Sequence, residues 1–511
     1  MAESSEKTKR IAKNTLLLYF RMLLTMLVSL YTSRVVLQAL GVDDFGIYNV
    51  VGGVVAMFNV LSGSLSSAIS RFITFELGKN DREKLKKVFS SSVTIQLILA
   101  ALIVIIAEVV GIWFINEKMN IAAERLSAAN WVFHFSILTF VVNLISVPYN
   151  AAIVAHERMS AFAYISILEV LGKLSIAYFI IISPIDRLVF YAILMWLVAV
   201  IIRFVYAFYC KRNFEECNYH FVWDLQLIKQ MFSFAGWNFI GSSSAILRDQ
   251  GGNIILNLFF GTTINAARGI AYQVYSAIYS FITNFMTALN PQITKSYATA
   301  DYTYMMKLVY KGSKFASYLL FVLSLPVLIN ADYLLRLWLG VVPEYTVLFV
   351  RLILIFALSE SISGPLITAQ LATGNIRNYQ LLVGGLQMLN LPLSFVVLNC
   401  GGAPEFVFII AIIISQLCLA CRLFMLRRMI NLSIRTFIKN VYANILLVFL
   451  IASIIPVVFS LFLEENMLNF FILISVSVIS SSLTIVYVGC SNTERLYLIE
   501  RIGKIRNKIH L

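Results

Sequence analysis

The feature that most constrains this chain is a series of fourteen apolar stretches, each about 20 residues or longer, separated by short polar segments. A helix needs about 20 mostly apolar residues to cross the hydrocarbon core of a membrane. Hydrocarbon offers backbone N–H and C=O groups no partner, so such stretches are helices unless they close into a barrel. Their length and lack of strict alternation argue against a barrel. We therefore expect an all-α, polytopic membrane protein with spans close to residues 15–40, 46–70, 90–114, 127–155, 161–182, 188–209, 232–260, 266–290, 314–332, 346–370, 379–399, 405–425, 441–463 and 468–489.

The composition agrees with a chain that is surrounded by lipid. Of its 511 residues, 60% are hydrophobic and only 13% are charged, whereas soluble globular proteins contain about 45–50% apolar and about 25% charged residues. No loop exceeds about 25 residues, and no GxxxxGK(S/T) phosphate-binding loop is present. We therefore expect no enzymatic domain and no cofactor.

The six cysteines are scattered along the chain. Cys418 and Cys421 form a CxxC pattern, but it lies inside an apolar stretch and has no further metal ligands nearby. We expect these cysteines to be ordinary residues of membrane helices, and we expect no metal site and no disulfide framework.

Lysine and arginine are distributed unevenly between the two sides of the membrane. If the N-terminus is cytoplasmic, 28 of the 40 Lys and Arg residues lie on the cytoplasmic side, 4 lie on the other side and 8 lie within spans. Cytoplasmic loops usually carry the excess of positive charge, so we expect both termini in the cytoplasm. The net charge of +14 then follows the topology and does not indicate a nucleic-acid partner.

Two parts of the chain resemble each other in sequence. The matched positions lie 220 or 217 residues apart: Gly41 with Gly261, Asp81 with Asp301, and Pro148 with Pro365. Because the repeat contains six spans, both copies have the same orientation, which predicts two lobes related by an axis along the membrane normal. The expected organisation is an N-terminal lobe at 1–210, a cytoplasmic linker at 211–230, a C-terminal lobe at 231–430, and two further spans with a cytoplasmic tail at 431–511.

Charged residues within the predicted spans are the first functional signal, because a charge at the centre of a membrane costs about 2.5–3.5 kcal/mol on insertion scales. Eight are basic, namely Arg21, Arg34, Lys173, Arg203, Arg248, Arg268, Arg351 and Arg422, and four are acidic, namely Glu108, Glu169, Asp249 and Glu360. This excess of cations favours an anionic substrate.

Several of these charges also have a structural interpretation. Arg203, Arg351 and Arg422 lie near span ends, where their side chains can extend to the lipid headgroups. Glu169 and Lys173 are four residues apart and can pair on one helix face. Glu108 and Glu360 are either protonation sites or buried acids, and we interpret His134 as a packed histidine without a partner.

The predicted spans 232–260 and 266–290 carry the most informative pattern. Asn238, Ser242, Asp249 and Asn253 share one helix face, with Arg248 beside it. The next span has Arg268, Tyr272, Tyr275 and Tyr279 at helical spacing. Tyrosine rings suit sugars, which have apolar faces and polar rims. The alternative is an aromatic belt at the membrane surface combined with helix packing.

Two tracts resemble those of a known family. The segment from NTLLLYFRMLLTMLVSLYTSRVV through KNDREKLKKVF, and the later segment RDQGGNIILNLFFG, resemble bacterial polysaccharide flippases, a branch of the group that includes multidrug and toxic compound extrusion transporters. The resemblance implies a V-shaped fold with a central cavity lined by the first, second, seventh and eighth spans. It also implies movement of undecaprenyl-pyrophosphate-linked oligosaccharides across the bacterial inner membrane for O-antigen, capsule or exopolysaccharide synthesis. The implied partners are this lipid-linked oligosaccharide, membrane lipids, and polysaccharide polymerase and chain-length proteins.

The site residues follow from the span pattern and the resemblance together. The cavity candidates are Arg21, Arg34, Arg248, Asp249, Asn253, Arg268, Tyr272, Tyr275 and Tyr279, and the candidates for ion coupling or ion pairing are Glu108, Glu169, Lys173 and Glu360. Arg21 and Arg34 diverge by about 140° around an ideal helix, so they cannot both face one cavity. We expect Arg248 to bind the pyrophosphate through its planar guanidinium and Asp249 to offset that charge when the cavity is empty.

Three other functional classes are alternatives to a flippase. A drug/cation antiporter of the related branch generally has twelve spans and relies on membrane acids, whereas cations predominate here. A membrane polymerase or ligase usually needs a large loop, which this chain lacks. A scaffold without transport activity gives no reason for so many charged groups within spans.

Overall fold

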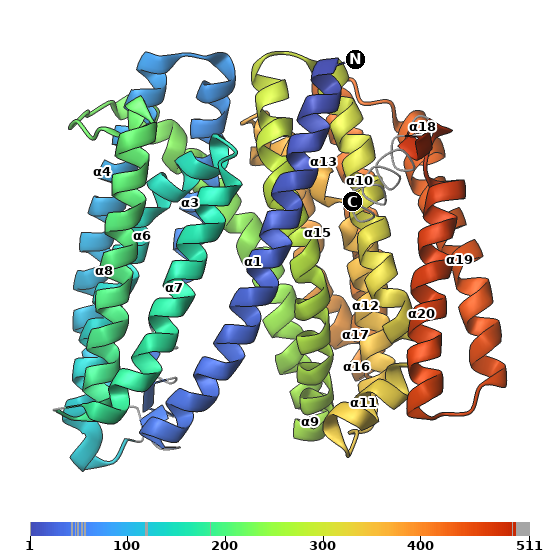
Figure 1. Cartoon of the computed structure of the whole chain (residues 1–511), viewed down its shortest axis with the longest axis horizontal. Coiled ribbons are helices and arrows are strands. Elements are labelled where there is room, and N and C mark those ends of the chain that lie inside the picture. Colours follow the sequence, from blue (N-terminus) through green and yellow to red (C-terminus); the bar gives the residue numbers. More distant parts are fainter. Residues whose placement is uncertain are drawn as a thin grey trace, which may run out of the picture. The chain divides into compact units, whose positions relative to one another are not determined.

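A computed structural model of the chain describes residues 2–41, 44–45, 47–48, 51–52, 55, 58–117, 121–183, 185–492 and 494–496. Every regular element in those ranges is helical (Figure 1), which confirms the predicted all-α class. The α-helices are α1 (Ala2–Leu40), α3 (Asn59–Lys79), α4 (Arg82–Ile106), α5 (Ile112–Glu117), α6 (Leu126–Ala155), α7 (Met159–Phe179), α8 (Arg187–Asn213), α9 (Leu225–Ala298), α10 (Tyr302–Ile329), α11 (Ala331–Leu339), α12 (Thr346–Ser361), α13 (Gly364–Ala372), α14 (Arg377–Tyr379), α15 (Gly385–Met388), α16 (Asn390–Asn399), α17 (Phe406–Ile430), α18 (Ile434–Phe437), α19 (Ala443–Phe462) and α20 (Met467–Thr484).

Short segments of tighter or wider helix join several of these elements. Wider, π-helical turns lie at Ala107–Gly111, Gln380–Gly384, Ile438–Tyr442 and Ile485–Gly489, and 3-10 turns lie at Ala123–Arg125, Ile180–Ile182 and Glu215–Cys217. They let α4 continue into α5, and α18 into α19, as single membrane-crossing helices with a local irregularity.

Eleven helical stretches in the described residues are long and apolar enough to cross a membrane, which makes the chain a multi-pass membrane protein. They are Arg10–Ser29, Arg82–Glu117, Ala123–Ala155, Met159–Ile182, Arg187–Asn213, Tyr302–Ile329, Thr346–Ala372, Arg377–Asn399, Phe406–Ile430, Ile434–Phe462 and Met467–Gly489. Each overlaps one of the fourteen predicted spans. Large apolar side chains on them are exposed, such as Phe204, Leu450 and Phe462, the last at 83%. These side chains are suited to contact with lipid.

The other three predicted spans fall on α3 and α9. The span over 46–70 lies partly outside the described residues, and α3 covers its second half. The spans over 232–260 and 266–290 are two arms of α9, which is interrupted at Gly261 by backbone angles of φ 79° and ψ −165°. Only glycine adopts this combination readily, so the helix breaks at Gly261. This position lies in the short loop that the sequence predicts between the two spans.

The backbone confirms the internal repeat. Left-handed φ angles occur at matched positions in both copies: Gly41 (83°) with Gly261 (79°), Asn80 (57°) with Ala300 (56°), and Glu157 (58°) with Gly374 (77°). The first two pairs are 220 residues apart and the third is 217 apart, as in the sequence comparison. Such angles end a helix and redirect the chain, so the two copies turn at the same points.

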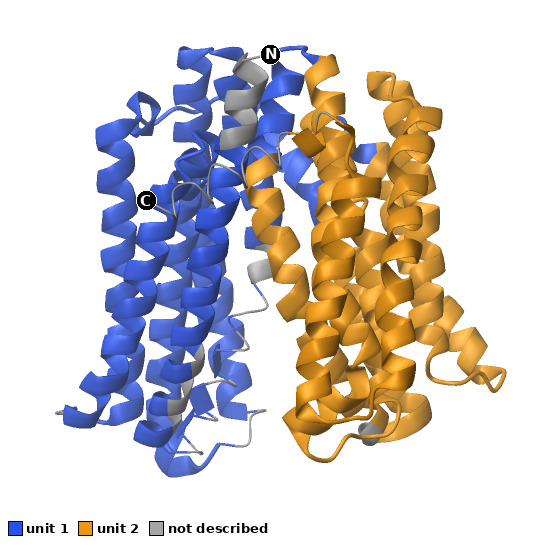
Figure 2. Cartoon of the chain, turned by 45° about the vertical axis from the view of Figure 1, so that its right-hand side comes forward, with its two compact units in different colours: residues 1–242, 290–301, 374–377 blue, residues 243–289, 302–373, 378–511 orange. Residues whose placement is uncertain are grey.

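The chain divides into two compact units, drawn in different colours in Figure 2. Unit 1 comprises Met1–Ser242, Asn290–Asp301 and Gly374–Arg377, and unit 2 comprises Ser243–Leu289, Tyr302–Thr373 and Asn378–Leu511. The lobe boundaries and the V shape expected from the sequence stay predictions.

Unit 1 is centred on α6, which packs against α3, α4 and α8, while α7 packs against α1 and α8. In unit 2, α10 packs against α12, α13, α19 and α20. Hydroxyl groups connect α10 with α12 and the residues after it: Ser313 Oγ donates to the Ile362 carbonyl at 2.8 Å, and Ser361 Oγ donates to Ser317 Oγ at 3.0 Å. Small polar residues of this kind allow membrane helices to approach closely.

A buried carboxylate joins three segments of unit 1. Glu157, in the turn between α6 and α7, has a side chain that is 1% exposed and accepts bonds from Lys295 Nζ (2.8 Å) and Gln292 Nε2 (2.7 Å) of α9. Arg10 of α1 reaches the same carboxylate at 2.7 Å. Burial alone would raise the pKa of Glu157, but the two cations and the amide outweigh it and hold the pKa below its usual value of 4.5.

We predict that Glu157→Gln lowers the stability of the purified protein by about 2–3 kcal/mol, because it leaves a half-buried Lys295 without its counter-charge. A carboxyl group with a depressed pKa stabilises the fold above its unfolded-state pKa, and this contribution is lost as the pH falls through the folded-state value. The difference in melting temperature between wild type and variant should therefore be constant from pH 7 to about pH 5.5 and shrink below about pH 4.5. A difference that grows on acidification contradicts the assignment.

Candidate functional site

The break at Gly261 gives α9 two arms, and charged side chains from both arms meet within unit 2. On the first arm, Arg248 and Asp249 bond each other directly, with Nε to Oδ1 at 2.8 Å and Nη2 to Oδ2 at 3.3 Å. From the second arm, the Tyr272 hydroxyl donates to Asp249 Oδ1 at 3.0 Å. The predicted residues Arg248, Asp249, Arg268 and Tyr272 thus form one connected group, which we call the α9 cluster.

Arg268 is the most deeply buried cation of the α9 cluster, at 3% exposed. Its Nη2 donates to the Asp249 backbone carbonyl at 2.9 Å and to the Tyr272 hydroxyl at 3.2 Å, which are both neutral acceptors. Its guanidinium also lies over the rings of Tyr272 (4.9 Å) and Phe408 (5.4 Å). In the described part of the chain Arg268 makes no ion pair, so its positive charge is not cancelled by direct contact.

Gly252 makes room for Arg268. A methyl group built on Gly252 would lie 2.5 Å from Nη1 and 2.7 Å from Nη2 of Arg268. The guanidinium therefore rests against bare backbone of the first arm, and any larger residue at position 252 displaces it.

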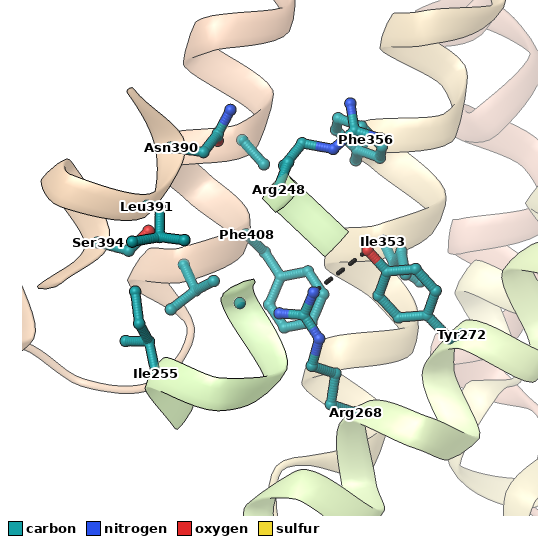
Figure 3. A pocket seen from close by; sticks show the side chains of 13 residues that line it. Arg248, Ile255, Arg268, Tyr272, Ile353, Phe356, Asn390, Leu391, Ser394 and Phe408 are labelled. Atoms are coloured by element: carbon teal, nitrogen blue, oxygen red, sulfur yellow. Dashed lines mark hydrogen bonds between the residues drawn. The ribbon is translucent and has the colours of Figure 1, made fainter. Parts of the chain in front are cut away.

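A small cavity borders the α9 cluster (Figure 3). It is lined by Arg248, Gly252, Ile255, Arg268, Tyr272, Ile353, Phe356, Asn390, Leu391, Ser394, Val407, Phe408 and Ala411. Its volume of about 20 Å³ suits about one water molecule. Two lining residues have a buried polar atom without a hydrogen-bond partner among the described residues, Arg268 Nε and Asn390 Oδ1. The cavity is thus lined mainly by apolar side chains with a few polar groups, and it is too small for a sugar or a pyrophosphate.

The side chains of Arg248 and Asp249 form the accessible part of the cluster, at 14% and 32% exposed. Arg248 also lies over the Phe356 ring at 4.9 Å and interacts electrostatically with Glu360. The predicted tyrosines continue from this point along α9. Tyr275 and Tyr279 stack with their ring centroids 5.1 Å apart, and Tyr275 also contacts Phe356.

Arg422 corrects one sequence interpretation. We expected it to extend to the membrane surface, but it is 1% exposed. Its Nη1 donates to Ser363 Oγ at 3.0 Å and its Nε donates to the Tyr379 hydroxyl at 3.3 Å, and it interacts electrostatically with Glu360. Two hydroxyl groups of unit 2, one in the turn before α13 and one on α14, therefore hold this cation inside. The position of Arg422 near a span end could not reveal this.

The remaining cavity candidates lie apart from the α9 cluster. Asn253 bonds Gln250 at 3.2 Å and does not line the cavity. Arg21 belongs to unit 1, where Nη1 donates to Ser166 Oγ at 3.3 Å and the guanidinium lies 4.5 Å from the Phe162 ring centroid. The side chain of Arg34 is outside the described part of the chain.

The acidic candidates of unit 1 have basic partners. Lys173 Nζ and Glu169 Oε1 are 2.5 Å apart, as their spacing predicted. Our interpretation of His134 as a histidine without a partner is wrong, because Nδ1 lies 2.9 Å from Glu108 Oε1. Glu108 lies in the π-helical turn Ala107–Gly111, and such turns often occur at functional sites. The two residues are 26 positions apart, so helical spacing gave no signal.

Sequence reasoning also missed the part of the cavity that comes from α12, α16 and α17. Phe356, Asn390, Ser394 and Phe408 lie on these helices and line the cavity. Among the lining residues that sequence reasoning missed, only Gly252 could have been found from the sequence. It follows Asp249 by three residues and so lies on the same helix face.

Solved structures of known transporters have a similar fold. The fold is similar to that of a multidrug resistance MATE family transporter of the MOP superfamily in an outward-facing conformation, with a TM-score of 0.72 and 14% identity over 83% of this chain and 96% of that one. A MOP superfamily transporter from Pyrococcus furiosus gives a TM-score of 0.67 and 14% identity over 85% and 97% of the two chains. The chain thus has a MATE-like fold.

The family follows from the sequence match. Residues 11–297, more than half of the chain, match the family described as polysaccharide biosynthesis protein, and the protein belongs to it. A curated relative, the uncharacterized membrane protein EpsK of Bacillus subtilis (strain 168), is 20% identical over 323 residues, or 62% of this chain. The match spans 63% of the length of EpsK.

We predict that Gly252→Ala destabilises the protein because the new methyl group displaces Arg268 from its bonds to Asp249 and Tyr272. The expected loss is about 1–3 kcal/mol, as for other overpacked sites. Gly269→Ala is the matched control: it lies on the same helix, has nothing within 4 Å of the added carbon, and gains helix propensity. Melting temperatures should fall for the first variant and stay level or rise for the second. In an Arg268→Ala background, Gly252→Ala should no longer destabilise, and equal losses in both backgrounds would contradict the packing.

Proposed function

We propose that this protein flips an oligosaccharide linked to undecaprenyl pyrophosphate across the bacterial inner membrane, for synthesis of O-antigen, capsule or exopolysaccharide. Membership of the polysaccharide biosynthesis family and the MOP transporter fold support a membrane transporter. A polysaccharide polymerase and chain-length proteins are its expected partners, because they act on the flipped product.

The observation that carries the proposal is the charge balance around the α9 cluster. Three buried or half-buried cations, Arg248, Arg268 and Arg422, outnumber the two carboxylates near them, Asp249 and Glu360. A low-dielectric interior strengthens the field of the remaining positive charge. The region is therefore suited to attract a pyrophosphate group and to repel a cationic drug.

The geometry suggests how the empty site stays stable. Asp249 holds Arg248 through two bonds, so no unpaired charge is exposed in the membrane at this position. A pyrophosphate offers oxygens with the same fork geometry as a carboxylate, so it can replace Asp249 as the partner of Arg248. Arg268 remains fixed by neutral groups and supplies the excess positive charge. Because the adjacent cavity is small, the substrate meets Arg248 and Asp249 at their exposed edge.

The alternative function is drug/cation antiport, which the MATE-like fold allows. That chemistry needs a membrane carboxylate available to a cation, whereas Asp249 is occupied by Arg248 and Tyr272. The similar transporter from Pyrococcus furiosus is described as having a binding pocket of reverse polarity that suggests a different function. The fold alone therefore does not fix the charge of the substrate, and the α9 cluster favours an anion here.

Flipping in proteoliposomes tests the role of Arg248. Arg248→Ala should reduce the rate of lipid-linked oligosaccharide transfer about tenfold to a hundredfold, as expected for loss of a charged hydrogen bond. Arg248→Lys should also be impaired, because an ammonium group cannot bond two phosphate oxygens in one plane. Arg351→Ala is the control, since Arg351 is exposed and its Nε donates to the Leu328 carbonyl. If Arg248→Lys transports like wild type at equal protein level, the bidentate contact is wrong.

The orientation of the chain is a separate prediction. Reporter fusions placed after Lys87 and in the C-terminal tail should give cytoplasmic signals, because both segments belong to the side that carries most Lys and Arg residues. A fusion after Arg187 should give a periplasmic signal. A periplasmic signal after Lys87 would reverse the proposed topology.

A further inference from the structure

Another cavity lies within unit 1 and is far larger than the one beside the α9 cluster. It has a volume of about 540 Å³, within the range of about 300–1,000 Å³ that is typical of small-molecule sites. Its lining comes from the C-terminal half of α3, the first turns of α9 and residues 374–377, which lead into α14. All three segments belong to the side of the membrane that the distribution of Lys and Arg assigns to the cytoplasm.

The charged groups of this cavity are all basic. Arg71, Lys229 and Arg377 line it, and no carboxylate does. Lys229 and Arg377 are exposed and form no ion pair within the described ranges. Glu76 interacts electrostatically with Arg71 but is itself bonded to Lys84 at 3.1 Å. Lys229 and Arg377 therefore present positive charge that no carboxylate in the lining of the cavity neutralises.

Arg71 is held in a fixed position. Its guanidinium lies 4.8 Å from the ring of Phe72, 4.5 Å from that of Phe75 and 5.9 Å from that of Phe234. It also rests against Gly374, where a methyl group would come within 2.6 Å of Nη2 and where φ is +77°. A fixed guanidinium loses little freedom on binding an anion, which favours a defined site over diffuse attraction.

The aromatic lining distinguishes this cavity from a site for a free anion. Phe72 and Phe234 are buried, and Trp237 stands beside Arg377, whose guanidinium is 5.5 Å from its ring. Tryptophan together with basic residues is typical of positions at the headgroup level of a membrane. Basic pockets between membrane helices on the cytoplasmic side bind the headgroups of anionic lipids.

We propose that this cavity binds the phosphate-bearing headgroup of a lipid from the cytoplasmic leaflet, with Arg71, Lys229 and Arg377 contacting the phosphate oxygens and Trp237 the region next to it. Two sources have this chemistry, an anionic phospholipid and a polyprenyl pyrophosphate. The proposal does not depend on flipping activity, so a protein that retains the lipid but does not flip would overturn the proposed function alone.

Native mass spectrometry of the full-length protein tests the site. Wild type in micelles that contain equal amounts of phosphatidylglycerol and phosphatidylcholine should retain phosphatidylglycerol preferentially. The variant Lys229→Gln with Arg377→Gln should bind it about tenfold to thirtyfold more weakly, since each basic residue near a membrane surface contributes a modest share of the attraction. Both side chains are exposed, so the fold should be kept, and an unchanged melting temperature checks this.

The matched control is Arg427→Gln with Arg428→Gln, which removes the same charge from two exposed residues at the end of α17. The control should bind phosphatidylglycerol like wild type, and equal losses in both double variants would reduce the effect to diffuse attraction and overturn the site. A short-chain polyprenyl pyrophosphate and phosphatidylglycerol are then compared as competitors for the cavity. If the polyprenyl pyrophosphate competes at the lower concentration, the pyrophosphate lipid is the occupant. If phosphatidylglycerol competes at the lower concentration, the phospholipid is the occupant. If inorganic pyrophosphate displaces the bound lipid as effectively as either competing lipid does, the cavity is a simple anion site and the proposed lipid binding is contradicted.

Discussion

Hydrocarbon provides no hydrogen-bond partner for peptide groups or charged side chains, and the rest of this structure depends on that constraint. It makes every described regular element a helix, and it requires each charge within a span to find its partner in the protein. Arg248 bonds the carboxylate that follows it in sequence, Lys173 bonds Glu169 one turn away, and Arg422 is held by hydroxyl groups. Arg268, like Arg422, bonds neutral acceptors, so no direct ion pair among the described residues cancels either charge.

The position of Arg268 depends on two glycines of α9. Gly261 breaks the helix with a backbone conformation that other residues rarely adopt, so that the chain can turn and place Arg268 against the first arm. Gly252 leaves the space that the guanidinium fills. The turn at Gly261 is matched by Gly41 in the first copy of the repeat. The candidate site therefore lies behind a backbone turn that both copies of the repeat share.

This chain has a distinctive distribution of charge on the shared fold. The MATE-like fold is common to transporters whose pockets differ in polarity, according to the description of the Pyrococcus furiosus protein. In this chain, cations outnumber carboxylates around the α9 cluster, and a separate basic cavity with aromatic walls lies in unit 1. Both features motivate the proposed phosphate-bearing ligands, and the chain belongs to the polysaccharide biosynthesis family.

The sequence by itself determined the helical class, the position of most spans and the break between the two arms of α9. It also determined the internal repeat, in which Gly41 and Gly261 occupy matched positions. It also brought Arg248, Asp249, Arg268 and Tyr272 into one hypothesis. These features depend on the length of apolar stretches and on the 3.6-residue period, which are set within a single helix. Only the tertiary structure decided that His134 pairs with Glu108, that Arg422 is buried, and that α16 and α17 complete the cavity. Those contacts join residues far apart in the chain, and which helix faces meet depends on the packing of many side chains at once, which no local pattern encodes.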